Sequence, residues 1–178
     1  MPPKDVLQPV DDAVRRHAKT LVRTARFGAL AVSDPERRMP MASRVSLATA
    51  SDGAPVFLIS QLSGHFGALE RDGRSSILVG EPGRGDPLAH PRLTVFGRAA
   101  KVEGDERARL RARFLARHPK AALYVDFTDF AFWRLAVEGA SFNAGFGKAY
   151  EMAPEDLLAP TDPALEEMEA GAVEHMNE

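Results

Sequence analysis

Small polar residues follow an apolar run in the segment LISQLSGHFGAL, residues 58–69. Ser60 and Ser63 supply hydroxyl groups, Gly64 lets another group approach the backbone closely, and His65 supplies an imidazole. The apolar run predicts a strand, and the residues after the cluster predict a short helix. Because the first turn of a helix presents unpaired N–H groups and the positive end of its dipole, this junction could bind a phosphate. It could equally be an ordinary helix cap, in which a serine hydroxyl accepts those N–H groups.

An arginine is placed to complete a phosphate site. Residues 42–50, ASRVSLATA, alternate as a strand does, and residues 56–60, VFLIS, are the expected partner strand. Asp52-Gly53 between them is a pair favoured in hairpin turns. Pairing across that turn places Arg44 near the level of Ile59 to Gln61. Since a guanidinium binds phosphate oxygens through two parallel hydrogen bonds, Arg44 and the polar cluster together predict a site for a phosphate monoester.

The elements that must position these residues are short strands separated by a few helices. Residues 10–25 show helical spacing, and DERARLRARFLARHP predicts an arginine-rich helix capped by Asp105 and ended before Pro119. Gly97 indicates a bulge or a close backbone approach within its strand, and Trp133 is expected in the core. Further strands are expected at 27–33, 75–80, 92–104 and 130–139, and an irregular segment at 140–150. Antiparallel strands joined by hairpins favour a small closed barrel in a mainly β fold with α (α+β).

Composition excludes several kinds of chemistry. The chain of 178 residues has no cysteine, so disulfides, thiolate metal sites and a catalytic thiol are excluded. Its five histidines form no metal-ligand motif, which disfavours a zinc site. No stretch approaches the roughly 18 apolar residues of a membrane span, and the first residues lack the apolar region of a secretory signal. We therefore expect a cytoplasmic protein that does not enter a membrane.

Charge is distributed unevenly along the chain. Residues 151–178 hold nine acidic residues and no Lys or Arg, so the first 150 residues carry all 23 Lys and Arg and a net charge of +7. A basic body could bind a phosphorylated cofactor or an anionic porphyrin. It has no recognisable nucleic-acid motif, so no nucleic acid is expected as a partner. We expect one domain over residues 1–152 and an acidic helical tail over 153–178, which could be the start of a second domain.

An arginine on one hairpin strand, opposite a small polar loop on the other, resembles the phosphate site of the pyridoxamine 5′-phosphate oxidase superfamily. The resemblance covers about residues 15–152, is most specific over 43–98, and is strongest to the haem-utilisation (HugZ/HutZ-type) branch. It implies a six-stranded antiparallel FMN-binding split barrel with flanking helices. It also implies a homodimer with a cofactor site for a small molecule at the interface.

The resemblance also implies roles for individual residues. Arg44 would bind the flavin phosphate, and Val45 and Ser46 would lie beside the isoalloxazine ring. His65-Phe66 stand where the oxidase proper has an Arg-Lys pair, and the haem-utilisation branch has His there, usually followed by Thr. The other cofactor contacts that the resemblance implies are Ile59, Ser60, Gly64 and His65, with Arg92 and Thr94 reaching the partner's site.

Three functions follow from this resemblance. The first is an FMN-dependent oxidoreductase or flavin carrier, in which flavin accepts a hydride. The second is a haem-binding and haem-degrading protein, with His175 as the iron ligand and Asp129 polarising that imidazole. The third is a haem chaperone or storage protein on the same scaffold. His175 could instead belong to the start of a further domain.

Overall fold

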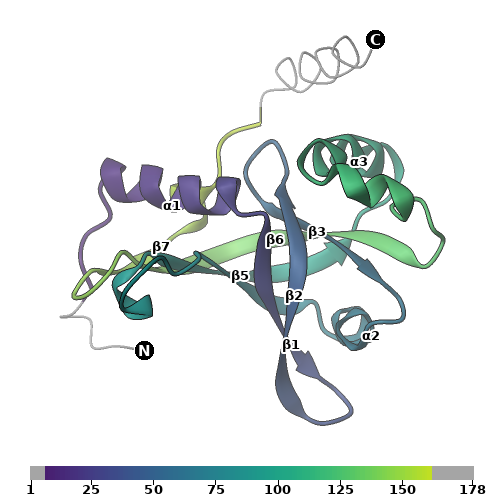
Figure 1. The fold of residues 1–178 in the computed structure, drawn as a ribbon, viewed down its shortest axis with the longest axis horizontal. Helices are drawn as coiled ribbons and strands as arrows, with labels where there is room; N and C mark the ends of the chain where they lie inside the picture. Colours follow the sequence, from purple (N-terminus) through teal and green to yellow (C-terminus); the bar gives the residue numbers. More distant parts are fainter. Residues whose placement is uncertain (1–6, 162–178) are drawn as a thin grey trace.

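Seven strands pair in one antiparallel sheet that curls until its first and sixth positions meet. The structure, a computed structural model, describes residues 7–161. The strands lie in the order β3-β2-β1-β4-β5-β6-β7, and β3 also pairs with β6, which closes six of them into a barrel (Figure 1). Their bounds are β1 Phe27–Asp34, β2 Met39–Thr49, β3 Pro55–Ser60, β4 Arg74–Val79, β5 Arg92–Lys101, β6 Phe130–Asn143 and β7 Ala149–Met152. The predicted mainly β fold with helices is confirmed.

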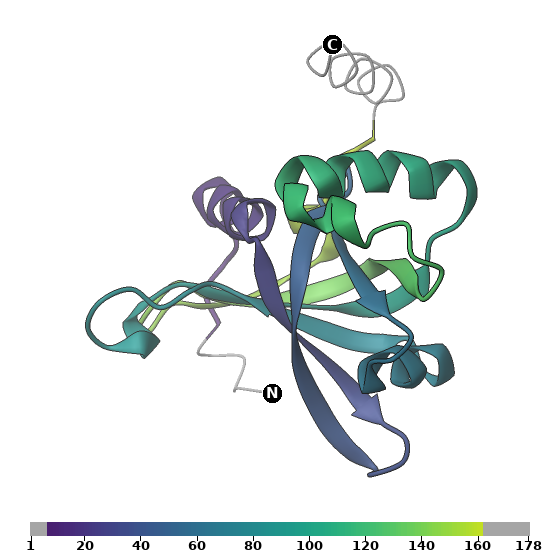
Figure 2. The ribbon, with the colours of Figure 1, turned by 45° about the vertical axis from the view of Figure 1, so that its right-hand side comes forward.

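Helices cover two sides of the barrel. They are α1 (Asp12–Thr24), α2 (Gly64–Arg71), α3 (Gly104–Arg117) and α4 (Pro154–Leu157), with short 3₁₀ helices at Pro87–Ala89 and Pro119–Leu123. Helices α1 and α3 both lie at one end of the barrel, whereas the β1–β2 hairpin extends from the opposite end (Figures 1 and 2). Among residues 7–161, no helix is long and apolar enough to span a membrane.

The β2–β3 hairpin forms with the predicted register. Leu47 pairs with Phe57 and Thr49 with Pro55, and Gly53 has the positive φ of 95° that this turn requires. Continuing the same register places Arg44 level with Ser60. The turn therefore sets which residues of the two strands face each other at the far end of the hairpin.

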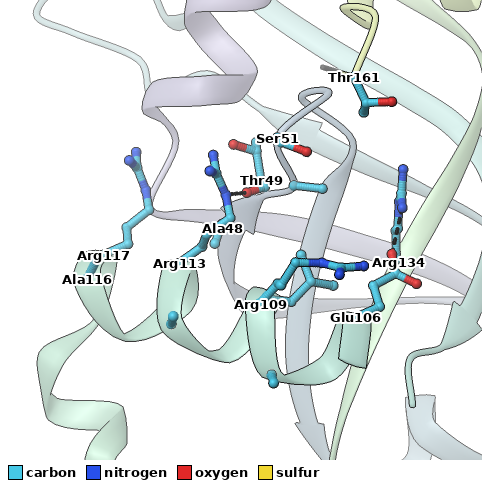
Figure 3. Close-up of a pocket in the computed structure, with 14 residues that line it drawn as sticks. Ala48, Thr49, Ser51, Glu106, Arg109, Arg113, Ala116, Arg117, Arg134 and Thr161 are labelled. Atoms are coloured by element: carbon cyan, nitrogen blue, oxygen red, sulfur yellow. Dashed lines mark hydrogen bonds and ion pairs between the residues drawn. The ribbon is translucent and has the colours of Figure 1, made fainter. Parts of the chain in front are cut away.

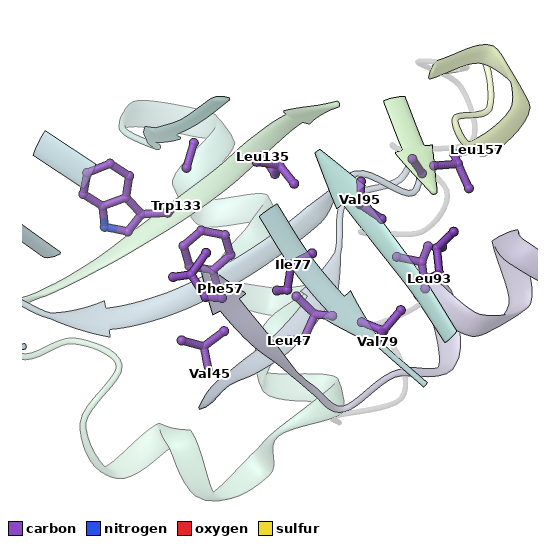
Figure 4. Close-up of a cluster of buried hydrophobic side chains, with 14 of the residues drawn as sticks. Val45, Leu47, Phe57, Ile77, Val79, Leu93, Val95, Trp133, Leu135 and Leu157 are labelled. Carbon is purple, nitrogen blue, oxygen red and sulfur yellow. The ribbon is translucent and has the colours of Figure 1, made fainter. Parts of the chain in front are cut away.

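Two clusters of buried side chains form the core. The larger cluster fills the barrel, where alternate residues of the strands point inward (Figure 4). Trp133 is 2% exposed there, which confirms its predicted place in the core. The smaller cluster lies under α3, where Leu110 and Phe114 pack against Phe132. Helix α4 also adds Leu157 to the larger cluster, while the division of the chain at residue 153 stays a prediction.

Two expectations for single elements are wrong. Strand β6 continues to Asn143 and β7 follows it, although residues 140–150 were expected to be irregular. Pairing with β5 on one side and β7 on the other supplies the hydrogen bonds that the local sequence does not predict. The N-cap of α3 is Glu103, which makes no side-chain capping bond, and Asp105 lies in the first turn. A carboxylate there still interacts favourably with the helix dipole.

The bulge at Gly97 gives a direct test of the barrel. The β5–β6 register shifts between Phe96 and Gly97, and a Cβ atom on Gly97 would lie 2.0 Å from the Ala136 carbonyl oxygen. We expect Gly97→Ala to lower the free energy of unfolding by about 2 kcal/mol, because the two backbones must separate. Gly67→Ala, in α2 where a Cβ meets nothing within 4 Å, should instead raise it by about 0.5–1 kcal/mol. Urea unfolding measures both, and equal effects would contradict the close approach at the bulge.

Candidate functional site

The hairpin brings most of the predicted cofactor residues to one cavity. It has a volume of about 310 Å³. Its lining consists of Arg44, Val45, Ser46, Leu58, Ile59, Ser60, Ser63, His65, Phe114, Tyr124 and Phe130. Gly64 is the exposed first residue of α2, between two lining residues. A neighbouring cavity of about 430 Å³ shares Arg44, Val45 and Ser46, so the two form one continuous surface on both sides of Arg44.

One wall of this surface is apolar and aromatic. Leu58 of β3 and Phe114 of α3 are buried at its base, whereas the Ile59 side chain belongs to the cluster inside the barrel. Tyr124 and Phe130 have ring centroids 5.1 Å apart and complete the wall. Phe130 reaches it because β3 pairs with β6, with Ser60 opposite Phe130. Such a wall suits a flat aromatic ligand. No local pattern indicated Tyr124 or Phe130 as part of a site, since only the barrel closure and the turn after α3 bring them here.

The small polar loop is held by its own hydrogen bonds. The Ser60 hydroxyl donates to Asp129 Oδ2 at 2.7 Å and accepts from the Leu62 N–H. The Ser63 hydroxyl donates to the Ser60 carbonyl oxygen at 2.6 Å. Both hydroxyl hydrogens are therefore used within the chain, and a carboxylate lies beside the loop. Ser63 is the N-cap of α2, but its side chain makes no capping bond, so the helix-cap interpretation is wrong for this hydroxyl.

Arg44 supplies an exposed positive charge between the two cavities. Its guanidinium lies 5.2 Å from the centroid of the Phe27 ring, which orients it by a cation–π contact. Within residues 7–161 it takes part in none of the ion pairs. Arg26 lines the second cavity and donates to the Arg117 carbonyl oxygen at 2.6 Å. An acidic ligand group could therefore bind Arg44 without displacing a carboxylate of this part of the chain.

Arg92 and Thr94 lie on β5 and do not line the cavities beside Arg44 of the same chain. Thr94 is opposite Leu78, Leu78 is opposite Ala29, and Ala29 is opposite Arg44, so these residues form one row across four strands. Residues opposite each other share a face of the sheet, and three strand spacings amount to about 14 Å. Thr94 therefore shares the face of Arg44 but does not reach it. The predicted reach of both residues into a partner's site stays a prediction.

The predicted iron ligand, His175, lies outside the described residues. Asp129 is half-buried, and its position beside Ser60 places it at the edge of the first cavity. Whether it approaches His175 stays a prediction. Within residues 7–161 there is no group of three or more His, Cys, Asp or Glu that could hold a metal ion.

His65 gives a pH-dependent test of this geometry. Burial lowers the pKa of its imidazole below the ordinary 6.5, so the folded chain releases a proton that the unfolded chain keeps. The stability contribution is full above pH 6.5 and is lost as the pH falls from there toward the folded pKa. We expect a ring-proton NMR titration to give a pKa below 6.5 and His65→Gln to flatten this part of the stability profile. A pKa at or above 6.5 would contradict the burial of the ring.

Comparison with known proteins identifies relatives of this chain. A family model described as CREG, beta-barrel matches residues 9–158. The chloroplastic heme oxygenase HOZ of Arabidopsis thaliana is 30% identical over 144 residues, which are 78% of this chain and 43% of HOZ. The chain thus spans less than half the length of that curated relative. A heme binding protein from Mycobacterium smegmatis is 33% identical with a TM-score of 0.76, over 84% of this chain and 61% of that one.

More distant structures share the fold. HutZ, the heme storage protein from Vibrio cholerae, is 23% identical with a TM-score of 0.56, over 70% of this chain and 91% of HutZ. A member of the pyridoxinephosphate oxidase family from Clostridium acetobutylicum is 12% identical with a TM-score of 0.63, over 83% of this chain and 99% of that one. Both likenesses agree with the split barrel that the resemblance implied. With the family model matching 150 residues of the barrel and its flanking helices, the chain belongs to the CREG, beta-barrel family.

Proposed function

We propose that this protein binds haem on the surface around Arg44 and acts in haem breakdown. The observation that carries the proposal is the hydrogen bond from the Ser60 hydroxyl to the Asp129 carboxylate, at 2.7 Å. It places a negative charge where the resemblance puts a flavin phosphate, and like charges close together repel. Two relatives at 30% and 33% identity, a heme oxygenase and a heme binding protein, support the same ligand.

The residues present fit a flat anionic macrocycle. The wall offers the partly exposed rings of Tyr124 and Phe130 to an apolar ring face. Arg44 and Arg26 line the two adjoining cavities, where they could bind carboxylates carried at the edge of the ring. A planar ligand with an apolar body and acidic groups on one edge matches this division of the surface.

The chain's own residues would orient the ligand and exclude water. When bound, haem supplies the iron at which dioxygen is reduced, with electrons from an external donor. Arg44 would hold an acidic group, and its contact with Phe27 limits where that group can sit. His65 would stay neutral near pH 7, because burial lowers its pKa, and could donate one N–H to the ligand. The bond between Ser60 and Asp129 keeps the loop in place.

FMN is the second candidate ligand. The backbone N–H groups of Gly64 and His65, at the start of α2, take part in none of the hydrogen bonds within residues 7–161, so they could receive a phosphate. Arg44 lies in the same cavity. The protein would then be a flavin-dependent oxidoreductase, with the isoalloxazine ring on the apolar wall.

We also propose a homodimer through the sheet face that carries Arg44. Phe27, Leu78 and Phe96 are 38%, 42% and 39% exposed and lie on this face, which is apolar for a surface. Thr94 lies on the same face about 14 Å from Arg44 within one chain. A two-fold axis through the face would bring Thr94 of one subunit toward Arg44 of the other, as the resemblance implies.

A spectroscopic titration tests the ligand. We expect haemin to give a shifted, saturable Soret band at one haemin per chain, and FMN to leave its visible spectrum unchanged. Arg44→Gln should weaken haemin binding about tenfold, because a hydrogen bond to a charged group is lost. Haemin dimethyl ester, which lacks the acidic groups, should bind both proteins equally. The matched control is Arg84→Gln, an exposed arginine of the 80–91 loop. Saturable FMN binding without a haemin response would contradict the proposal and favour the flavoprotein.

Light scattering tests the dimer. We expect the particle in solution to have twice the 19.4 kDa mass of one chain. Leu78→Asp should reduce it to a single chain, because a carboxylate would be buried in an apolar interface. Leu123→Asp is the control, since Leu123 is 79% exposed and lies outside this face. A wild-type protein of 19.4 kDa, or an unchanged mass in the Leu78 variant, would refute this interface.

A further inference from the structure

A second, larger cavity lies along α3 and shares no lining residue with the candidate site (Figure 3). Its volume is about 590 Å³. It lies between α3, the end of β2, the β2–β3 turn, β6 and Thr161. Polar and charged side chains line much of it, namely Thr49, Ser51, Glu106, Arg109, Arg113, Arg117, Arg134 and Thr161. Three alanines of α3, Ala108, Ala112 and Ala116, add small side chains that leave room within the groove.

Three arginines follow one face of α3 at a spacing of four residues. Arg109, Arg113 and Arg117 all line the groove, and Figure 3 shows them in a row along it. Like charges four residues apart on a helix repel and destabilise it. Burial lowers the pKa of Arg117, and the nearby Arg26 lowers it further. This row is therefore an arrangement that an anion would stabilise.

Carboxylates of the described residues balance only part of this charge. Arg134 is paired with both Asp52 and Glu106. Arg117 instead donates to backbone carbonyl oxygens, including that of Ala25 at 3.2 Å. Arg109 is exposed and takes part in none of the ion pairs found within residues 7–161. The groove thus carries a net positive charge.

The chain continues from this groove into its most acidic segment. Thr161 lines the cavity, and residues 162–178 contain six acidic residues and no Lys or Arg. We propose that the acidic segment 162–178, which lies outside the described residues, binds in the groove along α3 with its carboxylates against the arginine row. The proposal explains two features that the candidate site leaves unused, the arginine-rich helix and the acidic end of the sequence. It is independent of the ligand at Arg44.

The acidic segment is joined directly to the groove, because it follows Thr161 of the lining in the chain. A segment joined to the groove meets it at a high effective concentration, so ion pairs that are individually weak can hold it there. An acidic segment of another copy or of another protein would have the same chemistry but would lack this advantage. Binding would also fix where the chain leaves the barrel, beside the end covered by α1 and α3.

Photo-crosslinking from the groove tests the proposal without assuming which residues of the segment touch it. Ala112 is exposed and lines the groove, and we would replace it with p-benzoylphenylalanine in the full chain. Irradiation and mass spectrometry should then find crosslinks to peptides from 162–178. The matched control places the same group at exposed Ser33, on the β1–β2 hairpin at the opposite end of the barrel. Its yield of crosslinks to 162–178 should be at least about fivefold lower. Equal yields from the two positions would overturn the proposal.

Charge and connectivity are tested in the same assay. Arg109→Glu should lower the crosslink yield roughly threefold, as should 1 M salt, whereas Arg84→Glu should leave it unchanged. Mixing isotopically light and heavy chains separates the two sources of the segment. Crosslinks within one chain support the proposal. Crosslinks found only between light and heavy chains would mean that the groove binds the segment of another copy, and they would overturn the proposal. A crosslink yield that Arg109→Glu leaves unchanged would overturn it as well.

Discussion

The carboxylate of Asp52 joins the β2–β3 turn to the strand that closes the barrel. One oxygen accepts the Ala54 N–H at 2.9 Å within the turn, and the other accepts from Arg134 of β6 at 2.6 Å. Asp52 is 8% exposed, so losing Arg134 would leave a buried charge unpaired, which is strongly destabilising. The same carboxylate thus links the turn, which sets the hairpin register, to β6, which pairs with β3. Arg44 reaches the level of Ser60 through that register.

The electrostatics of the candidate site follow from this closure. Because β6 begins beside the end of β3, Asp129 lies next to Ser60 and accepts a hydrogen bond from its hydroxyl group. The hydroxyls of Ser60 and Ser63 are thereby used within the chain, and a negative charge lies beside the loop. Arg44, which lines the same cavity, supplies a positive charge. One split barrel can in this way favour different ligands by changing a few residues at the ends of two strands.

Local sequence patterns predicted the parts of the fold that local chemistry determines. The Asp52-Gly53 turn, the bulge at Gly97 and the buried Trp133 follow from residue type and alternation, and all three are confirmed. The β6–β7 pairing was missed because its hydrogen bonds come from distant strands. Tyr124 was missed as part of the cavity wall for a similar reason, since only the packing of the turn after α3 brings it there. The resemblance pointed to Asp129, but not to its hydrogen bond with Ser60.

The site around Arg44 depends on an anionic ring binding between this arginine and the apolar wall. Ferric haemin broadens NMR signals of nearby protons, so the amide spectrum of the haemin complex maps its position directly. We expect broadening of Val45, Ser46 and Ile59, and sharp signals from Ser51 and Thr161 in the α3 groove. Broadening confined to the α3 groove, or spread evenly over the surface, would contradict binding of the ring beside Arg44.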